Sequence, residues 1–298
     1  MNGKVRAAYV SCCIVWGSTW MFIKLGLRDL PPFLFAGTRM LLAAAVLLPF
    51  AASAGLRGHG RRAVRWMAFV GVLQIGIPYA LLFAAQQWVP SAFAAVLFAT
   101  FPVWLALVAR LLLRDHPLTP RKIAAALLGV GGVVLLELPA LRGQTLSPLA
   151  AAGGALVLVA SVVVAFANVF VRRELGGSPP VVIAFVQVVT GALVLVALSL
   201  ALERGRPAAF TPQAIAAIVY LAVFGTAVTY LFLFWLIPRV PMSVIGAIPL
   251  LDTTVAVTLG AIVLREPIGW PLLAGGTLVL VGAALANQVP AGPAGEGG

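Results

Sequence analysis

Ten long apolar stretches, separated by short polar or proline-containing breaks, run through this 298-residue chain. A helix needs about 20 apolar residues to cross the hydrocarbon core of a bilayer. Hydrophobic residues make up 62% of the chain and charged residues only 9%, whereas about a quarter of a soluble domain is charged. The sequence therefore predicts an all-α integral membrane protein with ten transmembrane helices. The composition also argues against an outer-membrane barrel, because its strands would alternate apolar with polar residues.

The predicted helices are bounded by charged clusters and by proline or glycine, which end helices. Breaks of this kind include 31–32, 172–174 and 179–180. The helices are expected at 7–24, 33–52, 66–87, 91–113, 122–138, 149–171, 181–202, 212–237, 242–264 and 270–287. The Gly/Pro-rich tail, 289–298, is expected to be disordered.

The net charge of +12 comes from Lys and Arg residues that lie between the apolar stretches. They form no continuous basic stripe, so the expected partner is a lipid bilayer and not a nucleic acid. With the N-terminus in the cytoplasm, twelve Lys and Arg residues fall inside and six outside, while Arg39 and Arg110 lie within helices. Because basic loops stay in the cytoplasm, both termini are predicted to be cytoplasmic in a cell inner membrane.

An internal repeat relates the two halves of the chain. At shifts of 148 or 151 residues, the matching pairs include Pro31–Pro32 with Pro179–Pro180, Trp20 with Asn168, Arg39 with Gln187, Tyr79 with Tyr230, Phe83 with Phe234, and Arg114–Asp115 with Arg265–Glu266. The repeats are expected to span 1–140 and 146–288, with five helices each. Because five is odd, the second copy must enter the membrane from the opposite side. Such inverted repeats are typical of secondary transporters with a substrate site at the membrane midplane.

Two further motifs carry a resemblance to a known family. The first helix contains Trp16-Gly17-Ser18-Thr19-Trp20, and Pro102 is followed thirteen residues later by Asp115 at a helix end. With these motifs the chain resembles EamA-type members of the drug/metabolite transporter superfamily. The resemblance implies a five-plus-five helix fold and export of amino acids, aromatic ones included, or other small metabolites. The second half departs from the pattern, because Thr253 stands where proline is expected and Pro249 lies four residues earlier.

Asp252 is the first candidate for a functional role, since an ionisable side chain in the middle of a span is expensive. Thr253, Thr254 and Thr258 follow it and could line a polar path. A carboxylate there costs several kcal/mol unless it is solvated, paired or protonated. Asp252 is therefore predicted to contact a substrate amine or to couple export to proton entry. The alternative is a packing role, with hydrogen bonds to neighbouring hydroxyls.

Arg39 is the second charged candidate, about two turns into its predicted helix. Its planar guanidinium could hold a substrate carboxylate. The favoured alternative is a structural arginine that pairs with Glu137 or snorkels toward the outer interface.

Aromatic and polar residues that recur in both halves form the remaining candidates. Tyr79 and Tyr230 lie well inside their spans and are expected to line a central cavity, although tyrosines also occur in interfacial belts. Pro78, Pro102 and Pro249 lie within helices and are expected to bend them. The candidate substrate-binding residues are Trp20, Arg39, Tyr79, Phe83, Pro102, Asn168, Gln187, Tyr230, Asp252 and Thr253.

The chain contains neither a phosphate-binding G-x-x-x-x-G-K-[ST] motif nor an H-E-x-x-H metal motif, and its two histidines lie in predicted loops. No enzyme activity, cofactor or metal is therefore expected.

The leading prediction is a secondary transporter, monomeric or homodimeric, that exports small amphipathic metabolites by alternating access. Amino acids, aromatic or otherwise apolar, are the expected small-molecule substrates. A passive facilitator or channel is the alternative, and a membrane-embedded enzyme is a third possibility.

Overall fold

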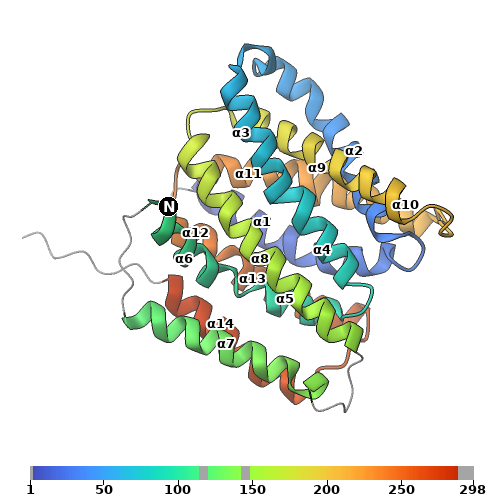
Figure 1. Cartoon of the computed structure of the whole chain (residues 1–298), viewed down its shortest axis with the longest axis vertical. Helices are drawn as coiled ribbons and strands as arrows, with labels where there is room; N and C mark the ends of the chain where they lie inside the picture. The colour runs from blue at the N-terminus through green and yellow to red at the C-terminus, as the bar shows by residue number, and fades with distance from the viewer. Residues whose placement is uncertain (1–2, 114–119, 142–147, 288–298) are drawn as a thin grey trace, which may run out of the picture.

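The computed structural model describes residues 3–113, 120–141 and 148–287, and all regular structure within them is helical (Figure 1). The predicted disorder of the tail concerns residues outside this part of the chain. The helices are α1 (Gly3–Gly26), α2 (Pro32–Ser53), α3 (Arg61–Gly71), α4 (Ile77–Ala85), α5 (Ser91–Phe98), α6 (Phe101–Leu113), α7 (Pro120–Leu141), α8 (Pro148–Glu174), α9 (Pro180–Leu202), α10 (Pro212–Ala222), α11 (Thr229–Leu236), α12 (Met242–Gly246), α13 (Ile248–Val263) and α14 (Trp270–Asn287), with a 3₁₀ turn at Leu56–Gly58.

Eight helical rods in the described residues are long and apolar enough to cross a membrane. Four of these segments lie in the first half of the chain and four in the second half. Some consist of one continuous helix and others of two consecutive helices. The helices predicted at 122–138 and 270–287 correspond to α7 and α14, which have 22 and 18 residues. An all-helical membrane protein is thus confirmed, while the crossing of the bilayer by α7 and α14 stays a prediction.

Two of the rods contain a π-helical segment at equivalent positions of the repeat. Val72–Gly76 joins α3 to α4, and Val223–Val228 joins α10 to α11. In the first half, Pro78 removes a backbone donor just after this segment. In the second half, the Thr226 hydroxyl donates to the Leu221 carbonyl oxygen at 2.8 Å, which interrupts the backbone ladder. The two halves therefore reach the same local geometry through different side chains.

Two other rods break just before a proline. The chain leaves helical geometry at 99–100, between α5 and α6, and again near Ala247, between α12 and α13. Pro102 and Pro249 are each the second residue of the helix that follows, where a missing N–H is tolerated. The helices predicted as continuous over 91–113 and 242–264 are thus each interrupted just before a proline, while a bend at these prolines stays a prediction. Pro249 lies four residues before the position that the repeat predicts for it, and the second break therefore also comes earlier than the first break would predict.

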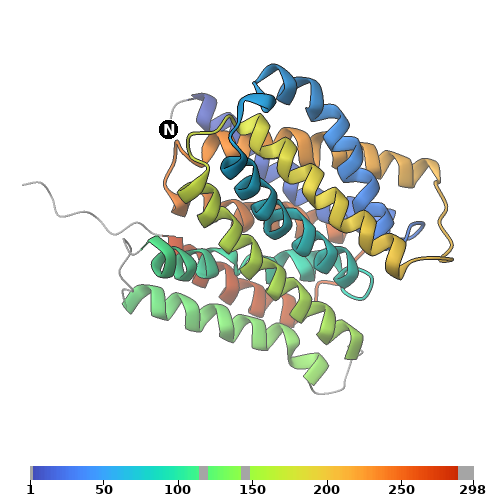
Figure 2. The same cartoon turned by 45° about the horizontal axis from the view of Figure 1, so that its top comes forward.

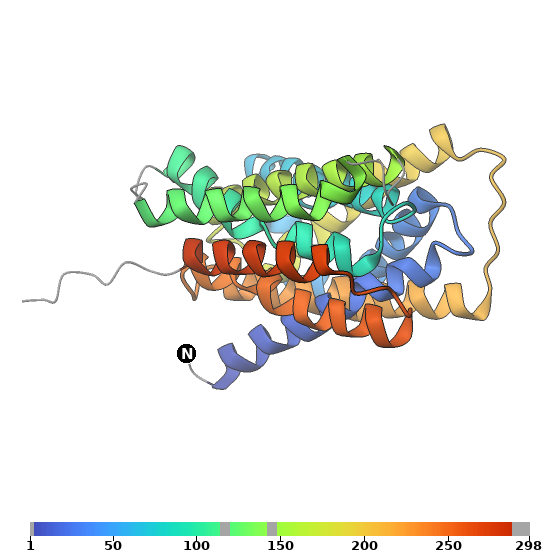
Figure 3. The ribbon, with the colours of Figure 1, turned by 90° about the horizontal axis from the view of Figure 1, so that it is seen from below.

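The helices of the two halves interleave instead of forming separate bundles. α1 packs against α10, α11 and α13 of the second half as well as α5 of the first, and α2 packs along α9. Figure 2 shows α2 and α9 side by side. At the opposite edge, α7 lies against α14 (Figure 3). A Cβ atom on Gly132 would lie 2.7 Å from the Gly275 carbonyl oxygen, so these helices approach closely because both lack side chains there.

Candidate functional site: a central cavity

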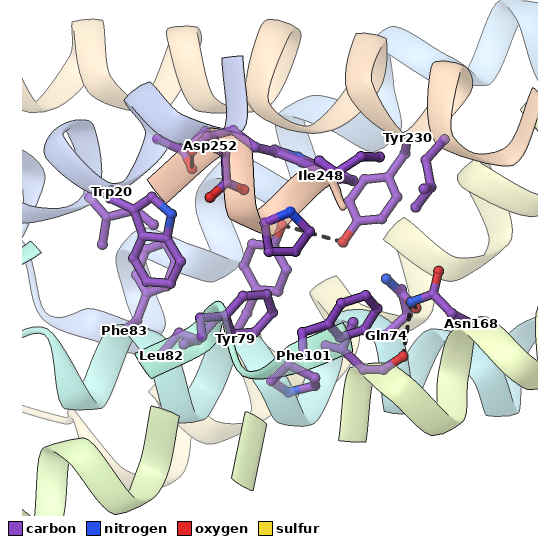
Figure 4. A pocket seen from close by; sticks show the side chains of 18 of the residues that line it. Trp20, Gln74, Tyr79, Leu82, Phe83, Phe101, Asn168, Tyr230, Ile248 and Asp252 are labelled. Carbon is purple, nitrogen blue, oxygen red and sulfur yellow. Dashed lines mark hydrogen bonds between the residues drawn. The ribbon is translucent and has the colours of Figure 1, made fainter. Parts of the chain in front are cut away.

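A cavity of about 100 Å³ lies where helices of both halves meet (Figure 4). Its walls come from α1, α2 and α4–α6 of the first half and α8 and α11–α13 of the second. The π-helical segment Val72–Gly76 contributes Gln74. The lining residues are Trp16, Thr19, Trp20, Ile23, Arg39, Gln74, Pro78, Tyr79, Leu82, Phe83, Phe98, Phe101, Val164, Asn168, Tyr230, Leu233, Ile245, Ile248, Pro249 and Asp252.

Aromatic rings form much of the cavity wall. The hydroxyl oxygens of Tyr79 and Tyr230 are 3.4 Å apart, and the Trp16 ring meets the Tyr230 ring edge-on at a centroid distance of 5.9 Å. Phe83 stacks on Tyr79 at 6.0 Å. The π-helical segments precede Tyr79 and Tyr230 in both halves, so each tyrosine follows a locally widened turn. This wall is suited to an apolar or aromatic side chain.

Arg39 extends from α2 into this aromatic group and is only 1% exposed. Its Nη2 donates to the Thr226 hydroxyl at 2.8 Å. Its guanidinium carbon lies 5.0 Å from the centroid of Tyr79 and 5.7 Å from that of Phe83. Within the described part of the chain, Nε and Nη1 have no hydrogen-bond partner. Two guanidinium nitrogens therefore have no acceptor among the described residues and could bind an anion.

This geometry contradicts one form of the favoured alternative for Arg39, the snorkelling side chain. A snorkelling side chain would place its head group in water, whereas the whole Arg39 side chain is buried and bonds Thr226 of the other half. The Glu137 side chain, proposed as the ion-pair partner, lies outside the described residues.

Asp252 provides the opposite charge. The side chain lies on α13, is 4% exposed and points toward the cavity (Figure 4). Its Oδ1 accepts no hydrogen bond from any described residue. α13 lies directly against α1, since a Cβ atom on Gly17 would be 2.6 Å from the Asp252 carbonyl oxygen. The described residues contain one ion pair, between Arg173 and Glu174, so Arg39 and Asp252 do not neutralise each other directly.

A polar bridge between the halves completes the wall. The Asn168 Nδ2 donates to Gln74 Oε1 at 3.2 Å and to the Val164 carbonyl oxygen at 2.9 Å. The Asn168 Oδ1 has no partner among the described atoms. An unpartnered acceptor is therefore present on a residue that lines the same cavity.

Seven of the ten predicted site residues line this cavity: Trp20, Arg39, Tyr79, Phe83, Asn168, Tyr230 and Asp252. Pro102, Gln187 and Thr253 do not. Pro102 is buried and is the second residue of α6, directly after the break between α5 and α6. Thr253 donates to the carbonyl oxygens of Pro249 and Ala95, and Gln187 packs against Gly71. Thr253 and Gln187 therefore face neighbouring helices, although Nε2 and Oε1 of Gln187 have no hydrogen-bond partner among the described residues.

The structure adds lining residues that sequence reasoning missed, among them Trp16, Gln74, Phe98 and Phe101. Trp16 belongs to the family-like motif of the first helix, which was a usable signal. Gln74 is a lone amide inside an apolar span, which is a second signal. Phe98 and Phe101 gave none, since phenylalanine is as common on a lipid-facing surface as in a cavity.

An all-helical membrane protein with opposite charges buried in a cavity between its halves has the features of a membrane transporter. The family model of the EamA-like transporter family matches the chain twice, over residues 7–138 and 151–288. The chain therefore belongs to the EamA-like transporter family, and it is a multi-pass membrane transporter and not an enzyme.

Several curated bacterial proteins are similar over most of their length. The uncharacterized inner membrane transporter YedA of Escherichia coli K12 is 29% identical, covering 83% of this chain and 78% of YedA. The uncharacterized transporter YoaV of Bacillus subtilis is 25% identical, covering 94% and 95%. A protein of known crystal structure is 22% identical, with a TM-score of 0.63 over 96% of this chain and 98% of that protein. That structure supports the fold.

Proposed function

We propose that this transporter exports amino acids with aromatic or other apolar side chains through the central cavity. The observation that carries the proposal is the presence of Arg39 and Asp252 in one cavity wall, both buried and both with unpartnered polar atoms. Buried charges are normally paired, because an isolated charge in an apolar medium is costly. A zwitterion would satisfy both: its carboxylate at Arg39 and its ammonium at Asp252.

The remaining wall defines the side chain of such a substrate. Tyr79, Tyr230, Trp16 and Phe83 offer apolar and aromatic surface, which favours phenylalanine-like or branched side chains over charged ones. A volume of about 100 Å³ is smaller than the ~300–1,000 Å³ of most ligand pockets. The cavity must therefore widen when substrate enters, as alternating access requires.

The proposed architecture is a pair of inverted five-helix repeats with ten spans, covering 1–140 and 146–288. The two segments matched by the family model and the paired π-helical segments support this arrangement. Both termini are placed in the cytoplasm on the basis of the Lys and Arg distribution. The inner membrane is the proposed location, as in the name of YedA. A monomer or a homodimer is compatible with this proposal.

Counterflow in proteoliposomes tests the function. Vesicles loaded with unlabelled phenylalanine should accumulate external radiolabelled phenylalanine or leucine, with saturation. Uridine and glutamate, which lack an apolar side chain, should be poor substrates in the same vesicles. Uptake of uridine without uptake of any amino acid would overturn the proposed substrate class. Unsaturable flux with no trans-stimulation would favour the alternative, a passive facilitator or channel.

A further inference from the structure

Three charged side chains bind neighbouring helix ends at one end of the helix assembly. This end contains the loops 27–31, 86–90, 203–211 and 264–269, which the proposed topology places outside; we call it the latch face. Glu203, Glu266 and Lys24 each bind the backbone at the end of a neighbouring helix. Exposed backbone groups at helix ends attract charges of the opposite sign.

The first contact joins the second half to α2. Glu203 follows α9 and is 6% exposed. Its Oε1 accepts from the Phe33 N–H at 2.8 Å and its Oε2 from the Leu34 N–H at 2.7 Å. Both carboxylate oxygens thus bind donors in the first turn of α2, which has no side-chain cap of its own. This bidentate contact holds the end of α9 against the start of α2.

The second contact joins the second half to α5. The Glu266 Oε1 accepts from the Ser91 N–H at 2.8 Å and from the Ser91 hydroxyl at 2.9 Å, and Oε2 accepts from the Ala92 N–H at 3.0 Å. Arg265 just before it has φ of 54°, a conformation uncommon outside glycine. That turn directs Glu266 back, so that its N–H donates to the Gly260 carbonyl oxygen at 3.0 Å.

Lys24 and Asp29 reinforce the same face. The Lys24 Nζ donates to the carbonyl oxygens of Gln86 and Val89, at 2.6 and 2.9 Å, at the end of α4. Asp29 accepts a hydrogen bond from the Thr211 hydroxyl, which in turn caps α10. Three of these attachments, through Glu203, Glu266 and Asp29, connect the two halves of the chain.

On the opposite face the described residues contain no equivalent of the Lys24 and Glu203 contacts, while Asp115, the equivalent of Glu266, lies outside the described part of the chain. By the repeat, Arg172 corresponds to Lys24, and Ile237 and Val240 correspond to Gln86 and Val89. Arg172 is exposed, and a recess of about 500 Å³ lies between the loops after α8 and α11. Among described residues, the hydrogen bonds of loops 54–60, 175–179 and 237–241 stay within one half. In the described loops, side-chain contacts between the two halves therefore lie on the latch face.

We infer that Glu203 and Glu266 are the latch of the outer gate, whose release opens the cavity to the outside. This inference rests on the proposed alternating access but not on the identity of the substrate. Alternating access requires that α2 and α5 part from the second half at this end, which breaks both carboxylate contacts. Each of them combines several charge-assisted hydrogen bonds, so their loss shifts an equilibrium by about tenfold or more.

Side-specific cysteine labelling tests the latch. In a Cys12→Ala/Cys13→Ala background, the reporter Leu82→Cys sits in the cavity wall near the latch face. Right-side-out proteoliposomes are treated with a membrane-impermeant maleimide. Adding Glu203→Gln or Glu266→Gln should raise the labelling rate about tenfold, because an amide supplies one neutral acceptor in place of two charged ones. The matched control is Glu174→Gln, a glutamate of the opposite face that pairs with Arg173 in its own half.

A second variant keeps every charge. A Cβ atom on Gly260 would lie 2.6 Å from the Glu266 Oε2 and 3.2 Å from the Ser91 Oγ, so Gly260→Ala should displace the carboxylate. Faster labelling in Gly260→Ala is the expected result, and it decides the matter if the glutamine variants do not fold. The inference would be overturned if the folded variants showed an unchanged labelling rate and only a lower melting temperature. Both glutamates would then serve only as helix caps that stabilise the fold. Amino-acid counterflow is scored separately, so failure of the proposed substrate leaves the labelling result interpretable.

Discussion

The hydroxyl oxygens of Tyr79 and Tyr230 lie 3.4 Å apart although 151 residues separate them in the chain. The same number, 151, is the shift that aligns the second half of the sequence with the first. Two positions related by a two-fold axis can touch each other only where they lie close to that axis. The contact therefore supports a two-fold axis that passes through the cavity wall. The two tyrosines would then lie at the centre of the change between the inward-open and outward-open states.

Removing the Tyr79 ring should impair transport without unfolding the protein. Tyr79 is half-buried and lines the cavity, so Tyr79→Ala should reduce phenylalanine counterflow about tenfold, which matches ~1.4 kcal/mol of lost aromatic contact. Tyr79→Phe, which keeps the ring, should reduce it less. Trp270→Ala is the control, since Trp270 is 61% exposed at a helix end. Wild-type counterflow in Tyr79→Ala would contradict a cavity role.

Arg39→Gln should discriminate between substrates by their carboxylate. The variant loses two free donors of the cavity, so phenylalanine affinity should fall by about ten- to a hundredfold, the value of a hydrogen bond to a charged group. Binding of phenethylamine, which has no carboxylate, should change little.

Arg39→Lys keeps the charge without the planar fork and should recover only part of the loss. Arg62→Gln, at an exposed position in the first turn of α3, is the control. Competition assays with both ligands measure the two affinities. Equal losses for phenylalanine and phenethylamine would show that Arg39 only organises the wall.

Asp252→Asn should separate exchange from energy coupling. The amide copies the shape of a protonated carboxyl group but cannot release a proton. If Asp252 carries the coupling proton, a pH gradient should no longer drive accumulation, while counterflow persists at a reduced rate. Tyr9 and Cys13 on α1 are titratable groups on a helix that packs against the helix of Asp252, so Tyr9→Phe and Cys13→Ala are tested beside it. Accumulation at the wild-type level in Asp252→Asn would restrict Asp252 to substrate contact or packing.

Cysteine labelling should also establish the topology. Ala208 and Gly60 are exposed in loops at opposite ends of the helices. With both termini cytoplasmic, an impermeant maleimide should label Ala208→Cys in intact cells and Gly60→Cys only after lysis. The cysteine-free background is the control for unspecific labelling. The reverse pattern at both positions would invert the proposed orientation.

The α7–α14 contact should depend on one glycine and not on its neighbour. A Cβ atom on Gly132 would lie 2.8 Å from the Val279 backbone nitrogen, whereas one on Gly131 would meet nothing within 4 Å. Gly132→Ala should therefore destabilise the fold by about 1–3 kcal/mol through overpacking. Gly131→Ala should be neutral or slightly stabilising, since alanine favours helices. Thermal melting in detergent measures both, and equal melting temperatures would contradict this close packing.

The sequence by itself determined that the chain is a bundle of apolar helices. In hydrocarbon every backbone group must be bonded within the segment, so long apolar runs leave the helix as the only solution. The repeat pairs and the membrane-depth charges also pointed to Tyr79, Tyr230, Arg39 and Asp252, because polar residues in a span are rare and conspicuous.

Only the tertiary structure decided which side of each helix faces the cavity. Thr253 follows Asp252 directly, yet it bonds Ala95 across a helix contact while Asp252 faces the cavity. Hydropathy is nearly uniform around these helices, so it does not specify their rotation. Rotation is set by close packing against segments far away in the chain, such as Arg39 against Thr226, 187 residues later. The latch of Glu203 and Glu266 follows the same rule, since a loop glutamate gains its role only from the helix end that packing brings to it.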